Sequence, residues 1–422
     1  MLKKLLLSVL VLFLVAGCSS NKPAEKEEET TGVVTEITEP VEVIFWHAMN
    51  SAQEEALTKL TEEFNAANEN ITIVLQNQSS YKDLSQKLTA TMASPENLPT
   101  ITQGYTNWFF NAANDGLLQD LSEYITNEVI GISDVEDIIA GFMEGAQING
   151  VQYGLPFNKS SEALFYNADQ FAEYGIEAPT TFEEFIAAAK TVYEKSNGAV
   201  VGGGFDSLNN FYVTQMINRG HKLDNTLDVT SEDSIEVINL YLDGIKEGYL
   251  RIAGTDKYLS GPFGNELIAM NIGSTAGEKY VQQGAEGKFT PEAIAVPVAK
   301  GIQQGTDIFM FEKATPEQKS AAFMYMNFLT NAENQLFWAA STGYLPVRES
   351  VINGEEYTTL DSMIAPIAAE VTEEMFTIPA DANAVYTELI AMMEEILSQP
   401  EAELAPILER YQTNIEALWA GE

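Results

Sequence analysis

The side chains that most often carry out catalysis are scarce in this sequence. It has two histidines, His47 and His221, far apart along the chain, and one cysteine, Cys18. The motifs HExxH, GxxxxGK[ST] and GxSxG, which would indicate a zinc protease, a phosphate-binding loop and a hydrolase, are missing. Because 62 residues are acidic, carboxylate pairs like those of a glycosidase can be drawn anywhere and indicate no site. We therefore expect no enzyme, no metal ion and no cofactor.

Aromatic residues beside polar ones form a more specific pattern. They occur in the segments Phe45–His47, Gly104–Phe110 and Gly343–Pro346, each at the end of an expected strand or helix. Ligands of open parallel sheets bind at the carboxyl ends of the strands. Aromatic rings near Asn, Asp, Ser and Thr suit both the C–H faces and the hydroxyl groups of sugars and polyols. The pattern therefore indicates a binding site for a compound of this kind.

These aromatic residues could also belong to the hydrophobic core. The ones assigned to the core are Phe45, Phe109 and Phe110. Tyr81, Tyr105 and Tyr344 lie near glycines or polar loops, which favours the binding site. For Trp46 and His47 both interpretations stay open.

The N-terminus has the layout of a secretory signal. Two lysines precede the apolar run Leu5–Val15, and small residues then lead to Cys18. The order Val15–Cys18 looks like a bacterial lipobox, in which the cysteine is lipidated and residues 1–17 are the signal peptide. One lipidated cysteine carries two acyl chains, enough for stable anchoring. The alternative is a plain signal peptide with an incidental cysteine, but the only cysteine falls where a lipobox requires it.

Residues 18–40 are predicted to form a disordered tether. After Cys18 the segment has no aromatic residue and is rich in Glu, Thr and Ser, so it cannot bury enough apolar surface to fold. Folded structure is expected to begin near Val41. The 382 residues after the tether (422 − 40) exceed the size at which one core usually divides, which predicts two lobes.

The chain is strongly acidic. It has 22 Lys and Arg against 62 Asp and Glu, and losing Lys3 and Lys4 with the signal peptide leaves 20 − 62 = −42. This charge excludes nucleic acid as a partner, because nucleic-acid binding needs a basic surface. Binding of the folded part to an anionic membrane is also not expected, so the lipid must hold the protein there.

The order of expected elements indicates an α/β protein. Strands are predicted at Val41–Phe45, Ile71–Leu75 and Pro99–Thr102, separated by a helix that begins with a capping box at Ser51–Glu54 and a helix over Tyr81–Met92. Alternation of this kind implies a parallel sheet covered on both faces. Further strands are expected at Leu155–Phe157, Ala163–Tyr166, Ala269–Ile272 and Ala293–Val298. Further helices are expected over Thr181–Glu194, Ile235–Lys246, Thr315–Leu329 and Ala384–Leu418, the last interrupted near Pro400 and Pro406.

Three segments resemble the family 1 extracellular solute-binding proteins of ABC importers. They are Phe45–Met49 (FWHAM), Pro156–Asn167 (PFNKSSEALFYN) and Thr342–Pro346 (TGYLP). The branch they resemble most binds glycerol 3-phosphate and glycerophosphodiesters. The resemblance covers essentially the whole chain after the tether. It implies two Rossmann-like α/β lobes of the periplasmic-binding-protein type II kind, joined by a hinge. The lobes are expected at 41–156 with 300–341, and at 157–299 with 342–422.

The resemblance also implies ligand-binding residues at the matching positions. These are Tyr81, Ser160, Ser274, Gly305 and Tyr344, with Tyr105, Trp46 and His47 as further aromatic candidates. Two positions depart from the pattern. The acidic residue that holds the glycerol hydroxyls in that branch falls at Thr106, and the arginine that pairs with phosphate has no counterpart near Phe376–Ala380. Lys159 is the nearest candidate cation, so a phosphate compound and a neutral sugar both stay open as ligands.

The sequence thus predicts a lipid-anchored substrate-binding protein of an ABC importer, at the outer face of the bacterial cytoplasmic membrane. Its expected partners are a glycerol phosphate or a sugar, the transmembrane permease subunits, and the membrane through the lipid on Cys18; the protein is expected to be a monomer. Two other functions compete. Two opposed carboxylates in a cleft would favour a surface enzyme acting on glycosides, and a filled interface between the lobes would favour an adhesion lipoprotein.

Overall fold

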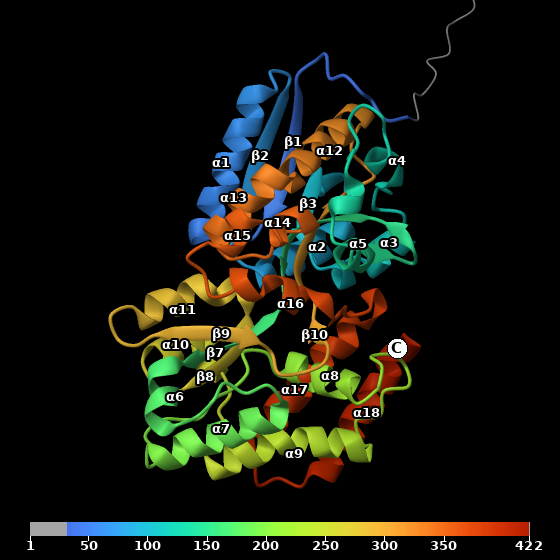
Figure 1. Ribbon diagram of the computed structural model, residues 1–422. Helices are drawn as coiled ribbons and strands as arrows, with labels where there is room; N and C mark the ends of the chain where they lie inside the picture. The colour runs from blue at the N-terminus through green and yellow to red at the C-terminus, as the bar shows by residue number, and fades with distance from the viewer. Residues whose placement is uncertain (1–31, 422) are drawn as a thin grey trace, which may run out of the picture. The chain divides into compact units, whose positions relative to one another are not determined.

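The structure is a computed structural model that describes residues 32–421 (Figure 1). The predicted signal peptide, Cys18 with its lipid and the first part of the predicted tether lie outside the described residues. Within 32–421, none of the helices has both the length and the apolar character needed to cross a bilayer. Over the same range, no group of three His, Cys, Asp or Glu side chains could hold a metal ion.

The described chain makes contacts earlier than the sequence predicts. The amide of Val34 donates to Ser320 Oγ at 2.9 Å, and Val33 and Ile37 pack against buried residues of the first lobe. These apolar residues interrupt the polar sequence of the predicted tether, and burying them against the lobe stabilises the segment. The chain therefore packs on the folded protein from Val33 onward rather than from Val41.

The first lobe is built on a five-stranded sheet with the order β2-β1-β3-β11-β6. Its strands are β1 (Val41–His47), β2 (Ile71–Asn77), β3 (Ile101–Gly104), β6 (Gly154–Ser160) and β11 (Gln304–Met310). Strand β1 is parallel to β2 and β3, as predicted, whereas β11 is antiparallel to both β3 and β6. Strand β11 was not predicted, because its glycine and aspartate, Gly305 and Asp307, break the apolar pattern of a buried strand.

Helices cover this sheet and bury its apolar side chains. They include α1 (Ser51–Ala67), α2 (Tyr81–Met92), α12 (Pro316–Thr330) and α13 (Ala332–Thr342) (Figure 1). The predicted capping box of α12 is present, with Thr315 and Gln318 bonded reciprocally. Between β3 and β6 the chain forms the shorter elements α3 (Phe110–Asn114), α4 (Ser122–Ile125), α5 (Ala140–Gly145), β4 (Gln147–Ile148) and β5 (Val151–Gln152).

The predicted capping box of α1 is wrong. The residue at the N-cap is Asn50, and Ser51 is already inside the helix with a positive φ of 49°. Glu54, which would have closed the box, accepts a hydrogen bond from Asn77 Nδ2 at 2.8 Å instead. This hydrogen bond to β2 therefore replaces the bond that would have closed the capping box at the start of α1.

The second lobe is built on a three-stranded sheet with the order β8-β7-β9. Strand β7 (Glu162–Asn167) pairs antiparallel with β8 (Met270–Ser274) and β9 (Pro291–Ala295). The longer helices around it are α7 (Phe182–Lys195), α8 (Leu208–Asn218), α9 (Glu232–Glu247), α17 (Asn383–Ser398) and α18 (Leu404–Ala420). The shorter ones are α6 (Ala168–Tyr174), α10 (Ser260–Gly264) and α11 (Glu278–Ala285). The capping box predicted at Thr181–Glu184 is present.

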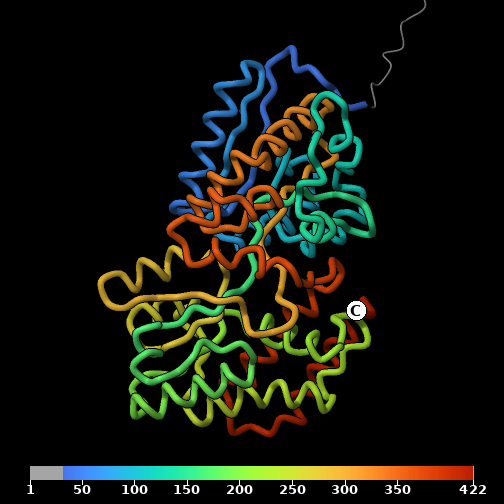
Figure 2. The backbone as a smooth tube through the Cα atoms, in the orientation of Figure 1, coloured from blue at the N-terminus to red at the C-terminus, as the bar shows by residue number. Residues whose placement is uncertain are grey.

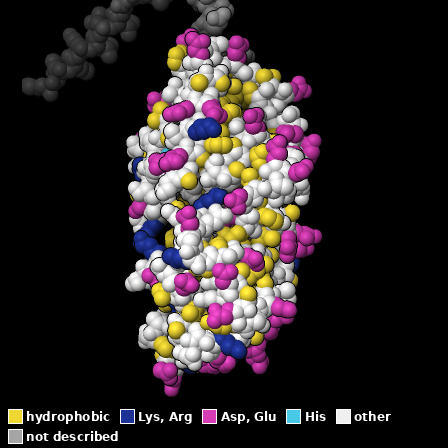
Figure 3. All heavy atoms as spheres, turned by 60° about the vertical axis from the view of Figure 1, so that its left-hand side comes forward, with side chains coloured by type: hydrophobic (Ala, Val, Ile, Leu, Met, Phe, Trp, Pro, Cys, Tyr) yellow, Lys and Arg dark blue, Asp and Glu magenta, His cyan; other side chains and the backbone are white. Residues whose placement is uncertain are grey.

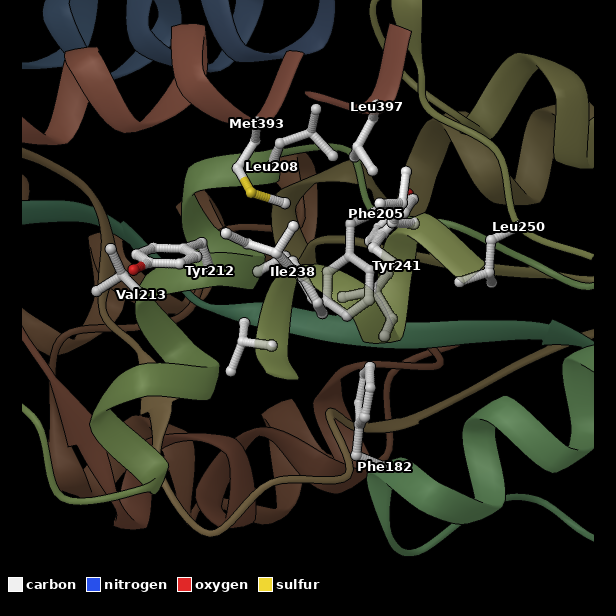
Figure 4. Packing of buried hydrophobic residues seen from close by; sticks show 14 of the residues in the cluster. Phe182, Phe205, Leu208, Tyr212, Val213, Ile238, Tyr241, Leu250, Met393 and Leu397 are labelled. Atoms are coloured by element: carbon white, nitrogen blue, oxygen red, sulfur yellow. The ribbon is translucent and has the colours of Figure 1, made fainter. Parts of the chain in front are cut away.

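The C-terminal helices complete the core of this lobe. Figure 2 shows the end of the chain beside segments from its middle, where α17 contacts α8, α9 and α18. Met393 and Leu397 of α17 point toward Phe205 and Leu208, which adjoin the start of α8 (Figure 4). The break between α17 and α18 falls at 399–403, as predicted near Pro400. Pro406 lies in the first turn of α18, where a proline costs no helical hydrogen bond.

The chain crosses between the two sheets at Ser161. Strand β6 belongs to the first sheet up to Ser160, and β7 of the second sheet begins at Glu162. The predicted boundary between 156 and 157 therefore falls inside β6. Two further connections are a pair of short parallel strands, β10 (Gly301–Ile302) with β12 (Met375–Phe376), and a series of short helices after α13. These helices are α14 (Glu349–Ile352), α15 (Glu355–Thr358) and α16 (Ala368–Glu373).

Candidate functional site

A cavity of about 330 Å³ is lined by residues of both lobes. The first lobe contributes the turn after β3, Tyr105–Trp108, together with Lys159 and the start of β11. The second lobe contributes the start of α8, with Asn209 and Asn210, and the start of α17, with Tyr386. A volume of this size lies within the range of small-molecule sites. The structure therefore brings four of the predicted residues to one cavity: Tyr105, Thr106, Lys159 and Gly305.

A buried ion pair forms one wall of this cavity. Lys159 Nζ lies 2.8 Å from Asp307 Oδ1, and the two side chains are 3% and 2% exposed. Thr106 Oγ1 donates to the other carboxylate oxygen at 3.0 Å. In the amide orientation that satisfies both its groups, Gln303 accepts from Lys159 Nζ at 3.1 Å and donates to the carbonyl of Gly141. The sequence has no acid at position 106, yet the carboxylate of Asp307 reaches Thr106 from β11.

A bulge in β6 lies opposite Thr306 and Asp307. Thr306 pairs with Asn158 and Asp307 with Pro156, which leaves Phe157 of β6 as the extra residue. Thr306 and Asp307 are both buried, and they bond to two neighbouring polar groups, Asn158 and Thr106. Gly305 precedes Thr306 with a φ of +84°, and a Cβ there would lie 2.1 Å from the carbonyl oxygen of Asn158. Only glycine fits this close approach to β6.

A cluster of buried hydroxyl and amide groups lies beside the ion pair in the sheet. The phenol oxygens of Tyr81 and Tyr344 are 3.0 Å apart. Asn158 Nδ2 donates to the oxygen of Tyr81 at 3.2 Å, and Asn158 Oδ1 accepts from Thr306 Oγ1 at 2.7 Å. Burial raises the pKa of both tyrosines. Both phenols therefore stay neutral and remain able to donate.

Three aromatic rings pack against one another at the edge of the cavity. The ring centroids of Tyr81 and Tyr105 are 5.6 Å apart, and those of Tyr105 and Trp108 are 5.1 Å apart at 61°. Edge-to-face packing of this kind holds each ring in place. Tyr105 and Trp108 line the cavity, so they present fixed apolar surfaces next to the polar wall.

From the second lobe, a line of hydrogen bonds leads to a buried acid. The hydroxyl of Tyr386 donates to Asn210 Oδ1, and Asn210 Nδ2 donates to Glu162 Oε1 at 2.7 Å. Burial raises the pKa of Glu162 to about 7; Asn210 opposes the shift and the nearby charge of Asp206 adds to it. Glu162 does not line the cavity and is linked to it through its hydrogen bond with Asn210. Within the described chain, Asp307 is the only carboxylate in the cavity lining.

Tyr344 is more buried than the sequence predicts. Gly343 ends α13 with a φ of 79°, as expected for a helix terminus. However, the ring of Tyr344 is 5% exposed and stacks on Trp338, with centroids 6.0 Å apart and planes 11° apart. Core packing therefore fixes this ring, and its hydroxyl alone reaches the cluster around Tyr81.

The two predicted serines lie at the ends of strands. Ser160 is the last residue of β6, is 3% exposed and pairs with Gln304 across the sheet. Ser274 is the last residue of β8, and its hydroxyl accepts from the amide of Ala276 at 3.3 Å. Neither belongs to the lining of the 330 Å³ cavity, as the structure describes it.

Trp46 and His47 have contacts of their own. The indole of Trp46 donates to Gln76 Oε1 at 2.9 Å, and Lys87 Nζ lies 3.9 Å above its ring. His47 is 1% exposed, and burial lowers its pKa to about 4, although Glu54 favours the charged form. Neither lines the cavity among the described residues, so their contacts are those of residues in the lobe core.

Several residues of the cavity were not found from the sequence. They are Asp307, Gln303, Gln304, Asn209, Asn210 and Tyr386. Asp307 carried a usable signal, since it directly precedes the apolar run Ile308–Phe311. The others are ordinary polar or aromatic residues, and only the fold brings them together.

A larger hollow of about 830 Å³ lies beside α11, α13 and α15. Within the described chain, its lining includes none of the predicted site residues, although Gly343, next to Tyr344, belongs to it. Glu278, the buried acid in its wall, is satisfied by Ser362 and by the amide of Met363. We therefore take the smaller cavity, which holds the polar cluster, as the candidate site.

Two α/β lobes with a polar and aromatic cavity between them define a binding protein of the periplasmic type II fold, as predicted. The chain belongs to the bacterial extracellular solute-binding protein family, whose model matches residues 59–364. The family resemblance seen in the sequence is thereby confirmed.

Individual relatives are distant. The sn-glycerol-3-phosphate-binding periplasmic protein UgpB of Salmonella typhimurium is 24% identical over 327 residues, which cover 72% of this chain and 73% of the relative. The maltotriose-binding protein of Pyrococcus abyssi is 22% identical over 397 residues, covering 88% and 81%. The crystal structure of UgpB from Mycobacterium tuberculosis with glycerophosphocholine superposes with a TM-score of 0.78 at 20% identity, covering 90% of this chain and 99% of that one.

Proposed function

We propose that this protein is the substrate-binding protein of an ABC importer, which captures a glycerol-phosphate-type compound or a sugar and delivers it to the permease. The observation that carries the proposal is the cavity lined by both lobes, with fixed aromatic rings on one side and amide groups on the other. Both kinds of ligand are supported by relatives, since one is named a glycerol-3-phosphate-binding protein and another a maltotriose-binding protein.

In this proposal the ligand contacts are shared between the lobes. Tyr105, Thr106, Lys159 and Gly305 lie around the cavity, while the hydroxyls of Tyr81 and Tyr344 form the adjoining buried cluster. Ser160 and Ser274 stand at the ends of β6 and β8, next to the crossing at Ser161, and would approach the ligand as the lobes move. The protein binds its ligand without converting it, since one carboxylate does not supply the pair that a glycosidase needs.

Closure of the lobes is the mechanism we propose. A ligand that contacts both lobes favours the closed form by the difference between its affinities for the closed and open forms. The crossing at Ser161, the pair β10 and β12 and the segment after α13 would together act as the hinge. The lobes are proposed as 41–160 with 300–341, and as 162–299 with 342–422.

A thermal-shift screen tests the proposal. The full protein, purified in mild detergent, is melted with sugars, glycerol phosphates and glycerophosphodiesters. A ligand present at 100 times its dissociation constant should add about 2.7 kcal/mol to the free energy of unfolding. The melting temperature should rise with at least one class of compound, and no compound should be consumed. Turnover of a bound glycoside, or no shift with any compound, would contradict the proposal.

A further inference from the structure

The cavity holds one positive and one negative charge, and each cancels the other. Lys159 and Asp307 are the only charged side chains that line it, over the part of the chain that the structure describes. They form an ion pair at 2.8 Å, almost fully shielded from solvent. The remaining lining is amide, hydroxyl, aromatic and aliphatic. A ligand therefore meets a site that is polar but has no net charge.

Two of the three hydrogens of the Lys159 ammonium group are already engaged. Asp307 Oδ1 accepts one at 2.8 Å and the oxygen of Gln303 accepts another at 3.1 Å. The ring of Phe142 faces the same ammonium, with its centroid 5.8 Å away. A phosphate would have to compete with a carboxylate in direct contact for this cation. It would also lie close to the negative charge of Asp307.

No arginine reaches the cavity to replace it. Each of the four arginines bonds elsewhere: Arg219 to Gln215, Arg251 to Asp256, Arg348 to Asp134 and Asp137, and Arg410 to Glu395. Phosphate recognition in proteins normally relies on a guanidinium group or on helix N-termini. Within the described residues, no guanidinium group lines the cavity.

One buried acceptor in the cavity lining lacks a hydrogen-bond donor among the described residues. Gln304 lines the cavity, and its Oε1 is buried without a partner among the described residues. A buried acceptor without a partner costs free energy until a donor reaches it. A hydroxyl group can donate to this oxygen or to the carboxylate of Asp307, whereas an ionised phosphate oxygen can only accept. Tyr105 and Trp108 add aromatic faces for the C–H groups of a carbohydrate.

We infer that Asp307 determines the specificity of this receptor: by occupying Lys159 and presenting a carboxylate, it selects uncharged polyhydroxylated ligands and excludes phosphate esters. The inference rests on the proposed function and narrows it to one of its two ligand classes. Asp307 thereby acts as both the acceptor for ligand hydroxyls and the group that neutralises the cation.

The test compares two classes of probe on the full protein in mild detergent. Calorimetric affinities are measured for maltotriose and a panel of smaller neutral sugars, and for sn-glycerol 3-phosphate and glycerophosphocholine. The wild type should bind a neutral sugar and show no measurable affinity for the phosphate esters. In Asp307→Asn, Lys159 is released, and the affinity for glycerol 3-phosphate should rise by roughly tenfold or more, as expected for a charge-assisted bond.

Two further variants separate specificity from folding. Lys159→Gln combined with Asp307→Asn removes both charges, so it avoids a buried unpaired lysine and should fold even where Asp307→Asn does not. It should bind the sugar more weakly than the wild type, because the carboxylate that accepts from ligand hydroxyls is lost, and it should gain no phosphate binding. Asp115→Asn changes the net charge by the same one unit as Asp307→Asn, but on an exposed residue after α3. It should bind both classes of probe as the wild type does.

The outcomes distinguish the inference from the proposed function. Tighter binding of a phosphate ester than of any sugar by the wild type overturns the inference and leaves the importer function intact. The inference is also overturned if the double variant gains affinity for phosphate esters. It is overturned as well if Asp307→Asn folds but gains no more affinity for phosphate esters than Asp115→Asn does. Failure of the wild type to bind any probe would count against the proposed function itself.

Discussion

Tyr344 is held by two kinds of contact that can be separated. Its ring stacks on the fully buried Trp338, while its hydroxyl meets the hydroxyl of Tyr81. Truncation to alanine removes both, so it mixes a packing effect with a binding effect. Phenylalanine keeps the ring and removes only the oxygen.

Tyr344→Phe should therefore lower ligand affinity while changing the melting temperature little. Tyr344→Ala should cost about 3–5 kcal/mol of stability, as for other aromatic residues cut to alanine in a core. Melting temperature and calorimetric affinity are measured for both. Unchanged affinity in Tyr344→Phe would remove this hydroxyl from the proposed site.

The buried acid Glu162 predicts a dependence of stability on pH. Its pKa is raised to about 7 in the folded protein from 4.5, chiefly by burial. Between these values the folded state keeps a proton that the unfolded state has lost, so the free energy of unfolding falls as the pH rises and levels off above about 7. The loss is on the order of 3 kcal/mol.

Glu162→Gln should remove this loss. Glutamine can still accept from Asn210 but does not ionise. Its melting temperature should exceed that of the wild type above pH 7 by a margin that vanishes toward low pH. Glu183→Gln, on an exposed position of α7, is the matched control. A margin that stays constant with pH would contradict the assignment of the titration to Glu162.

At the level of elements, the start of α12 offers a direct test of a local signal. Thr315 and Gln318 form a complete capping box, whereas the similar sequence at Ser51 makes no cap bond in α1. Thr315→Ala should cost about 1 kcal/mol of stability, and Ser51→Ala much less. Urea unfolding of both variants measures the difference. Equal costs would mean that the hydrogen bond at Thr315 does not carry the effect.

Local signals in the sequence were sufficient for most elements of the first lobe. The alternation of strands and helices from Val41 to Gly104 predicts the parallel part of the sheet, because each strand is apolar and each helix has one apolar face. Strand β11 could not be predicted in this way. Its place between β3 and β6 depends on distant residues, since Asp307 is stable in a buried strand only beside Lys159, which is 148 positions away in the chain.

Part of the candidate site could also be predicted from the sequence. Lys159 lies in one of the three segments that resemble the family, Tyr105 and Thr106 follow an expected strand, and Gly305 was found by its match to a position of the family pattern. Asn210 and Tyr386 come from helices whose sequences show only core packing, and the second lobe must fold before they meet. Trp46 and His47 illustrate the reverse case: their motif is specific, but their side chains pack inside the first lobe.

For the whole molecule, the proposed hinge predicts a change of shape on binding. A ligand that bridges both lobes should favour the closed form, as in other hinge proteins. Small-angle scattering of the purified protein should then show a smaller radius of gyration at saturating ligand. The Tyr344→Phe variant at a ligand concentration too low to saturate it should show a smaller decrease. An identical scattering curve with and without bound ligand would rule out closure.

The charge of the whole molecule fits the proposed lipid anchor. Acidic side chains are spread over the face seen in Figure 3, and the chain after the signal peptide carries 20 − 62 = −42 charges. A surface of this kind is repelled by anionic lipids, so it supplies no affinity for the membrane on its own. In our proposal, the lipid on Cys18 provides the attachment beside the permease.

Cys18→Ala should therefore release the protein from membranes or leave it unprocessed. Ser19→Ala, one residue further, preserves the lipidated cysteine and should remain membrane-bound. Fractionation of cells into membranes and medium measures the distribution, and the released protein should bind its ligand as the wild type does, because the cavity lies far along the chain in residues 105–390. If Cys18→Ala partitions with membranes as fully as Ser19→Ala does, the anchor is not at this cysteine.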